Sequence, residues 1–230
     1  NDTEGVSTLD LVLIQRHILG ITSFDSPYKV IAADINSDRR VSGTDLVVLR
    51  KTILGIYKEF PTNNSWRFVE SAQSLTVDNA LTDFNEVINI QDLESNMLNE
   101  DFVAVKIGDV NATAKTNARD LGTQTRSAGT LTLGLEEQNV VEGQLVDLTF
   151  SSNDFNKVYG YQFTLELNGL TVESVVAGDA NMSEANIGIL DENTVTVSYS
   201  DMQGLGTSNN LFTLTAVATE SGNIGNMIDL

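Results

Sequence analysis

The stretch Val6-Ser-Thr-Leu-Asp-Leu-Val-Leu-Ile-Gln-Arg-His-Ile-Leu-Gly-Ile21 recurs 35 residues later as Val41-Ser-Gly-Thr-Asp-Leu-Val-Val-Leu-Arg-Lys-Thr-Ile-Leu-Gly-Ile56. Each copy spaces its apolar residues with the period of a helix. Each copy also ends in Leu-Gly, where glycine accepts the left-handed conformation that stops a helix. The repeat therefore predicts two helices of about ten residues each, and we expect them to pack on each other because short helices are not stable alone.

The residues before the second helix carry side-chain oxygens at alternate positions. This spacing is typical of an EF-hand calcium loop, in which alternate residues point at one centre and the last ligand comes from the following helix. We therefore expect Ca²⁺ as a cofactor. Counting from position 1 of such a loop, the ligands at positions 1, 3, 5, 7 and 12 are Asp34, Asn36, Asp38, the carbonyl of Arg40, and Asp45.

One position departs from the calcium-loop pattern. Position 6, normally glycine, is Arg39, and the sharp turn there costs a residue other than glycine about 1 kcal/mol. An Asx-rich turn that only caps the helix is the alternative interpretation of the same residues.

The first copy offers a weaker loop. Aligning Asp10 with Asp45 puts Asn1 at position 3, Thr3 at position 5 and the carbonyl of Gly5 at position 7, and position 1 would precede the sequence. This loop is either cut by the start of the sequence, which we interpret as a piece of a longer protein, or degenerate.

The duplicated stretches, from Asp10 to Gly20 and from Asp45 to Gly55, resemble the type I dockerin family. The resemblance covers roughly residues 1 to 58 and extends to dockerin-like segments of large exported surface proteins of Gram-negative bacteria. It implies calcium binding and a cohesin-like protein partner, in the same chain or a neighbouring one. The implied partner-binding residues are Thr8, Leu9, Gln15 and Arg16 in the first copy and Gly43, Thr44, Arg50 and Lys51 in the second; an ordinary solvated helix face is the alternative.

The middle of the chain is less regular. Residues 102–107 predict a short strand, and the following Gly108-Asp109-Val110-Asn111 is similar to the start of a calcium loop. Thr113, the carbonyl of Lys115 and Asp120 would continue that loop, but no amphipathic helix follows, which favours a plain turn. Residues 112–129 have the composition of a linker.

From residue 130 the apolar pattern changes to period two. Five stretches separated by Gly, Asn and Asp indicate strands of an antiparallel β-sandwich. They are residues 131–135, 145–150, 161–167, 194–199 and 211–217. Their order resembles cohesins and related carbohydrate-binding sandwiches, on the stretches Glu142–Leu148, Gly160–Leu165, Val195–Asp201 and Leu211–Val217.

Composition excludes several function classes. The formal charge of −19, from 32 acidic and 13 basic residues, repels nucleic-acid phosphates and anionic lipid, so we expect neither partner. No apolar run reaches the ~20 residues of a membrane span. The chain has no cysteine and one histidine, His17, which leaves no disulfide, zinc cluster or iron–sulfur site. The adjacent acidic residues do not form the facing pair of a glycosidase, so we expect no enzyme.

Together these patterns predict an α+β multidomain chain. It would hold a paired EF-hand-like, dockerin-like module at residues 1–60, a connecting extension with short strands and a linker at 61–127, and a cohesin-like sandwich at 128–230 that lacks its final strand. Residues 128–230 hold fourteen acids and one base, whereas residues 1–60 hold eight acids and seven bases. We expect a non-catalytic, calcium-stabilised module of the cell surface or extracellular space, used for adhesion or head-to-tail filament assembly. A carbohydrate-binding or anchoring appendage of a secreted polysaccharide-degrading enzyme is the alternative.

Overall fold

A computed structural model describes residues 2–82, 84–92, 95–115, 131–153, 158–178, 182–201 and 210–230. The chain forms two compact units, one of Asn1–Thr52 with Tyr57–Gly122 and the other of Ile53–Ile56 with Thr123–Leu230. No helix within the described ranges combines the length and the hydropathy that crossing a bilayer requires.

Both helices predicted by the repeat are present. They are α1 (Thr8–Ile18) and α3 (Gly43–Ile53). Beyond α1, Gly20 N–H donates to the His17 carbonyl at 3.0 Å and Ile21 N–H to the Arg16 carbonyl at 2.9 Å, the bond pair of a Schellman motif. Gly20 and Gly55 have φ of 69° and 76°. The two Leu-Gly stops therefore end their helices for the reason that the sequence suggests.

A third helix, α2 (Pro27–Ala33), lies between them and was not predicted. Its N-cap is Ser26, whose Oγ accepts a hydrogen bond from Tyr28 N–H at 3.3 Å. Pro27 occupies the first turn, where its missing N–H costs nothing. Four of its seven residues are buried, so tertiary packing stabilises this short helix.

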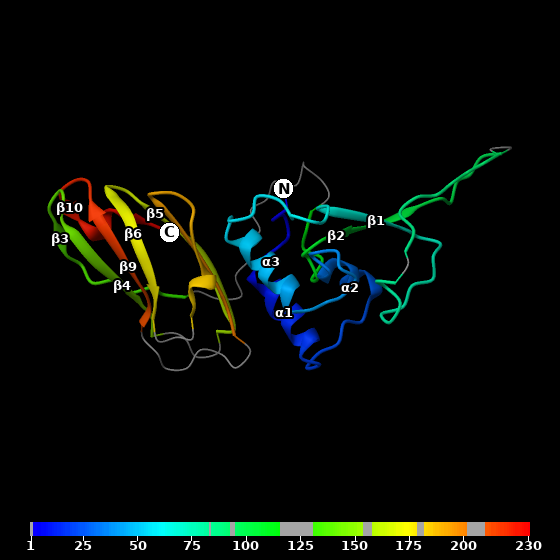
Figure 1. Cartoon of the computed structure of the whole chain (residues 1–230), viewed down its shortest axis with the longest axis horizontal. Coiled ribbons are helices and arrows are strands. Elements are labelled where there is room, and N and C mark those ends of the chain that lie inside the picture. Colours follow the sequence, from blue (N-terminus) through cyan, green and yellow to red (C-terminus); the bar gives the residue numbers. More distant parts are fainter. Residues whose placement is uncertain are drawn as a thin grey trace. The chain divides into compact units, whose positions relative to one another are not determined.

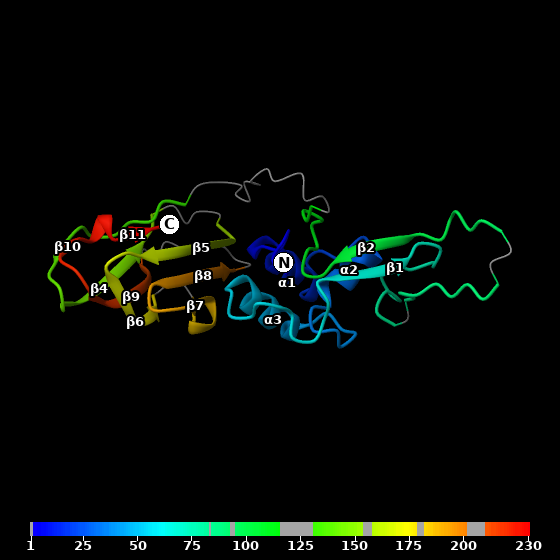
Figure 2. The ribbon, with the colours of Figure 1, turned by 90° about the horizontal axis from the view of Figure 1, so that it is seen from above.

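Strands β1 (Trp66–Glu70) and β2 (Phe102–Lys106) form an antiparallel ribbon in the same unit as the helices. Val69 of β1 and Val105 of β2 are the apolar residues that this ribbon buries in the core. Directly after β2, Gly108 N–H donates to the Ala32 carbonyl of α2 at 2.8 Å. The described part of residues 61–115 thus contributes to the helical unit instead of only connecting two modules. Figures 1 and 2 show the segment between β1 and β2 running away from the two strands as a long loop.

Gly108, directly after β2, packs closely against α3 and against the residues just before α1. A Cβ added there would lie 2.9 Å from Leu49 Cδ1 on α3 and 3.1 Å from Val6 Cγ2, just before α1. Gly108 also has φ of 86°, so glycine is required both by conformation and by space. This glycine sets the segment that follows β2 against the start of α1.

The second unit is an antiparallel β-sandwich. One sheet has the order β11-β5-β8-β7, a second β4-β9-β6, and a small pair is formed by β10 and β3. Two short 3₁₀ turns, η1 (Glu184–Asn186) and η2 (Ile224–Asn226), connect strands. The strands are β3 (Asn139–Val140), β4 (Leu145–Ser151), β5 (Gly160–Leu167), β6 (Leu170–Ala177), β7 (Ile187–Ile189), β8 (Thr194–Ser200), β9 (Asn210–Ala218), β10 (Gly222–Asn223) and β11 (Ile228–Asp229).

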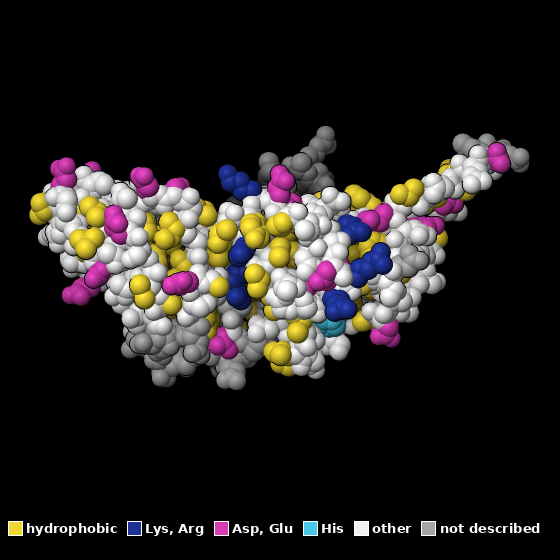
Figure 3. All heavy atoms as spheres, viewed as in Figure 1, with side chains coloured by type: hydrophobic (Ala, Val, Ile, Leu, Met, Phe, Trp, Pro, Cys, Tyr) yellow, Lys and Arg dark blue, Asp and Glu magenta, His cyan; other side chains and the backbone are white. Residues whose placement is uncertain are grey.

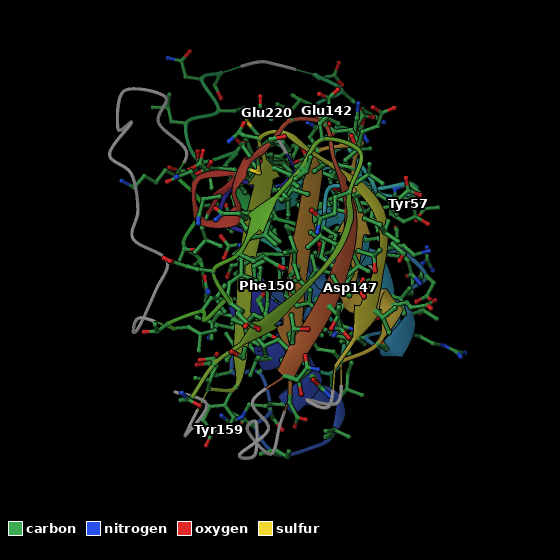
Figure 4. All side chains as sticks on the ribbon, turned by 90° about the vertical axis from the view of Figure 1, so that its left-hand side faces the viewer. Tyr57, Glu142, Asp147, Phe150, Tyr159 and Glu220 are labelled. Carbon is green, nitrogen blue, oxygen red and sulfur yellow. The ribbon has the colours of Figure 1, made fainter. Side chains whose placement is uncertain are left out.

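Aromatic rings from both sheets fill the core. Phe150 of β4 and Phe212 of β9 stack with centroids 4.7 Å apart, and Tyr161 and Tyr199 stack at 5.3 Å in the other sheet. Phe163 of β5 reaches Phe212 at 6.1 Å and so joins the two sheets. Along β4 buried and exposed residues alternate, as period two requires. Figure 4 shows this unit with Glu142 and Glu220 at one end of the strands and Tyr159 at the other.

The strand prediction was wrong at residues 131–135 and incomplete elsewhere, because it did not include β1, β3, β6, β7, β10 and β11. Residues 131–135 were expected to form a strand, but among them Gly134 alone pairs, by an isolated bridge to Ser151. Strand β6 was missed, because its pairing with β9 shifts register between Val172 and Ser174. A bulge of this kind breaks the two-residue alternation by which a strand is found in a sequence.

Candidate calcium site

The loop between α2 and α3 folds tightly around two aspartates. Asp34 ends α2 and Asp45 lies in the first turn of α3. Asp45 is fully buried, and Asp34 is 6% exposed. Ser37 and Arg39 have positive φ, 59° and 68°. The sharp turn expected at loop position 6 is therefore made by Arg39, in a conformation that glycine would adopt at lower cost.

Backbone amides hold both carboxylates in place. Asp34 accepts from Asp38 N–H through Oδ1 and from Arg39 N–H through Oδ2, both at 3.0 Å. Asp45 accepts from Asn36 N–H at 3.1 Å and from Ser42 N–H at 2.9 Å. These bonds fix the two ends of the loop near each other, as a cation site with ligands at positions 1 and 12 requires.

Neighbouring residues also hold the loop backbone. Thr62 Oγ1 donates to the Asn36 carbonyl at 2.7 Å, and Asn63 Nδ2 donates to the Asp34 carbonyl at 2.9 Å. The segment after α3 thus stabilises the loop from outside. Such support keeps ligand oxygens in place before any ion arrives.

The charges in this loop favour a cation. Burial raises the pKa of Asp34, and the nearby carboxylates of Asp45 and Asp38 raise it further. Burial likewise raises the pKa of Asp45, with a smaller contribution from Asp38. A divalent cation would offset both the like-charge repulsion and the lost hydration.

Carboxylates alone do not complete the site. Across the described ranges no three His, Cys, Asp or Glu side chains converge closely enough to hold a metal by themselves. Calcium prefers six to eight oxygens, including amides and backbone carbonyls. A cation here would therefore also use Asn36 Oδ1 and the Arg40 carbonyl. Asn36 already contacts Asp38, with Nδ2 donating to Oδ2 at 3.0 Å.

The first copy is completed by a distant part of the chain. Asn1 lies outside the described residues, and the Thr3 carbonyl accepts from Val6 N–H at 3.1 Å. Asp10 is fully buried, and its Oδ2 accepts from Ser7 N–H at 2.9 Å. Its Oδ1 accepts from Val110 N–H at 3.0 Å, across 100 residues of sequence. Sequence reasoning did not connect these two segments.

The electrostatics of the first copy are more extreme than those of the second. Burial raises the pKa of Asp10 to about 7, and the carboxylate of Asp109 raises it as well. Close by, Thr113 Oγ1 donates to the Gly5 carbonyl at 2.9 Å. The residues expected at positions 7 and 12 of the first loop thus lie beside the motif that begins at Gly108.

The implied partner-binding residues lie on or beside α1 and α3. Leu9 is 53% exposed, and Arg16, Gly43 and Thr44 are also exposed, whereas Gln15 and Arg50 are half-buried. Lys51 is half-buried and lies 5.2 Å from the ring centroid of Tyr57. Thr8 is buried.

Comparison with known proteins identifies the helical segment. Among solved structures, the chain is similar to a non-cellulosomal cohesin from Archaeoglobus fulgidus, at 20% identity and a TM-score of 0.33 over 40% of this chain and 67% of that one. It is also similar to a type I cohesin–dockerin complex from Clostridium thermocellum, at 12% identity and a TM-score of 0.34 over 40% of this chain and 74% of that one. A third similar structure is the sixth cohesin of Acetivibrio cellulolyticus scaffoldin B, solved with a Cel5 dockerin mutant. Its identity is 16% and its TM-score is 0.32, over 39% of this chain and 74% of that one. No curated protein matches the chain. A family model matches residues 1–54, which therefore carry a dockerin type I domain, as the repeat predicted.

Proposed function

We propose that residues 1–54 bind a cohesin-like protein domain, and that calcium in the loop from Asp34 to Asp45 holds their helices in the binding conformation. The observation that carries this proposal is the dockerin type I match over the same residues whose loop carboxylates are anchored by backbone amides. The module acts by binding and has no catalytic role.

The binding surface that we propose lies on the exposed sides of α1 and α3. Residues seven apart on a helix lie on one face, two turns from each other. Leu9 and Arg16 are related in this way on α1, and so are Thr44 and Lys51 on α3. Because the repeat shifts by 35 residues, Leu9 corresponds to Thr44 and Arg16 to Lys51. The two faces therefore offer a similar layout with one base each.

Charge supports an acidic partner surface. Figure 3 shows the basic side chains over the helical unit, whereas the charged side chains of the described sandwich residues are all acidic. Such complementarity speeds encounter and fixes orientation more than it strengthens binding. A sandwich like the one in this chain is therefore a suitable partner, in the same chain or a neighbouring one.

Pairing between neighbouring chains would build a head-to-tail filament, which we place at the cell surface or in the extracellular space, in an adhesive role. A heterologous contact propagates unless its rotation closes a ring.

The alternative, a carbohydrate-binding appendage of a secreted enzyme, has less support. Glycan sites commonly use exposed aromatic rings, but Tyr161 and Tyr199 are buried in the core at 8% and 2% exposure. Among the described residues of the sandwich, Tyr159 is the one exposed aromatic side chain. This favours protein binding over glycan binding.

Sedimentation velocity of the full chain tests the proposal. We expect association that grows with protein concentration in calcium, falls in chelator, and weakens in the double variant Arg16→Glu, Lys51→Glu because both helix faces then repel an acidic partner. Lys58→Glu, an exposed charge outside these helices, is the matched control. A monomer at high concentration and low salt, with calcium present, would contradict assembly between chains.

A further inference from the structure

The segment after β2 and the start of α1 together repeat the geometry of the loop before α3. Asp109 accepts from Thr113 N–H through Oδ1 at 3.1 Å and from Ala114 N–H through Oδ2 at 2.6 Å. In the other loop Asp34 accepts from the amides four and five residues ahead in the same way. The residue three positions after each aspartate has nearly the same φ, 57° at Ala112 and 59° at Ser37.

The closing aspartate of each loop is held by the same cap. Ser7 donates to Asp10 Oδ2 through N–H at 2.9 Å and through Oγ at 3.1 Å. Ser42 donates to Asp45 Oδ2 through the same two atoms, at 2.9 Å and 3.3 Å. Asp109 therefore takes position 1 of a calcium loop and Asp10 takes position 12. These two residues come from opposite ends of the sequence of the helical unit.

Close packing at Gly5 brings the two pieces together. A Cβ added to Gly5 would lie 2.5 Å from Ala114 N and Cα, and φ at Gly5 is 75°. Only glycine allows this approach. The Gly5 carbonyl, at position 7 by alignment with Arg40, then lies within hydrogen-bond distance of Thr113 Oγ1, at position 5.

An independent observation points to a ligand. Asn111 stands at position 3 after Asp109, and its side-chain oxygen Oδ1 is buried from solvent with no hydrogen-bond donor among the described residues. A buried acceptor without a partner is unfavourable, by about 1–3 kcal/mol. In the contiguous loop the equivalent oxygen, Asn36 Oδ1, accepts from Asp38 N–H at 3.0 Å. Asn111 therefore has a free acceptor where a calcium loop has a ligand.

We propose that these two segments form a second, discontinuous calcium site. Its ligands are the oxygens of Asp109, Asn111 and Thr113, the carbonyl of Gly5, and the carboxylate of Asp10. They are the hard carboxylate, amide, hydroxyl and carbonyl oxygens that calcium prefers. The cation would tie the start of α1 to the end of β2 and so close the helical unit. This site does not depend on a cohesin-like partner or on the loop from Asp34 to Asp45.

Calcium stoichiometry of the full chain, measured by equilibrium dialysis with radioactive calcium, tests the inference. We expect two ions per wild-type chain. Asn111→Ala removes an oxygen that makes no hydrogen bond, so the fold is kept, and Asp109→Asn keeps most of the shape. Each variant should lose one ion or weaken one site at least about tenfold, and Asp34→Asn should lose the other ion.

Asn99→Ala, an exposed asparagine of the loop between β1 and β2, is the matched control and should keep both ions. One ion in the wild type that depends on Asp34 and not on Asn111 would overturn this inference and leave the first site standing. Two ions in both Asn111→Ala and Asp109→Asn, each with unchanged affinity, would overturn it as well. No bound ion in the wild type would overturn both sites.

Discussion

The helical unit contains two similar aspartate loops, one before α3 and one before α1. They differ in whether their residues are continuous in the sequence. The loop before α3 runs continuously from Asp34 to Asp45, whereas its counterpart before α1 joins residues 109–113 to residues 5–10. Closing the second arrangement costs more chain entropy, since loop-closure entropy grows with the length enclosed. The continuous loop can therefore order locally, but the discontinuous one depends on the fold of the whole unit.

Calcium removal should have the largest effect and should affect both loops. Each site adds about 2.7 kcal/mol at a hundredfold excess of calcium over Kd. We expect chelator to lower the melting temperature of the helical unit, and Asp34→Asn to reproduce part of that loss. Differential scanning calorimetry measures it, with the sandwich transition as the internal control. An unchanged helical transition would mean that neither loop holds a structural ion.

Substitution at Gly5 should separate the two loops. Gly5→Ala places a Cβ against the Ala114 backbone in a left-handed conformation, which we expect to cost roughly 2 kcal/mol or more. Gly20→Ala is the matched control, because φ there is 69° but nothing lies within 4 Å of the added Cβ. Urea unfolding compares the two variants. Equal losses would show that the approach of residues 109–113 to α1 does not matter for stability.

Glycine at loop position 6 should give the smallest effect, with opposite signs in the two loops. Arg39→Gly removes the penalty of φ 68° and should stabilise by about 1 kcal/mol. Ala114, the equivalent residue after Asp109, has no positive φ, so Ala114→Gly should destabilise by roughly 0.5–1 kcal/mol. Chemical denaturation in calcium measures both. Stabilisation by Ala114→Gly would contradict the backbone comparison.

Local patterns located two of the three helices and fewer than half of the strands among the described residues. The duplicated apolar spacing located α1 and α3, and alternation located β4, β5, β8 and β9. Helix α2 was missed although Ser26-Pro27 carries a helix-start signal, because its seven residues are too few to show a period. Strand β6 was missed because a bulge interrupts its alternation.

The site was predictable only where its residues are contiguous. Asp34 to Asp45 could be read directly, since ligand spacing is local. The motif at Asp109 was visible too, but it lacked a helix after it, which favoured a plain turn. Its missing closing residue is Asp10, 99 positions earlier in the printed sequence. Such a pairing follows from the packing around Gly108 and Gly5, which no local pattern records.

A crystal structure of the full chain grown in millimolar calcium tests the central claim most directly, because anomalous scattering locates the ion. We predict an anomalous peak within about 2.3–2.6 Å of oxygens of Asp34, Asn36, Asp38 and Asp45 and the carbonyl of Arg40. We predict a second peak between Asp109 and Asp10. A loop from Asp34 to Asp45 without an ion under these conditions would contradict the account.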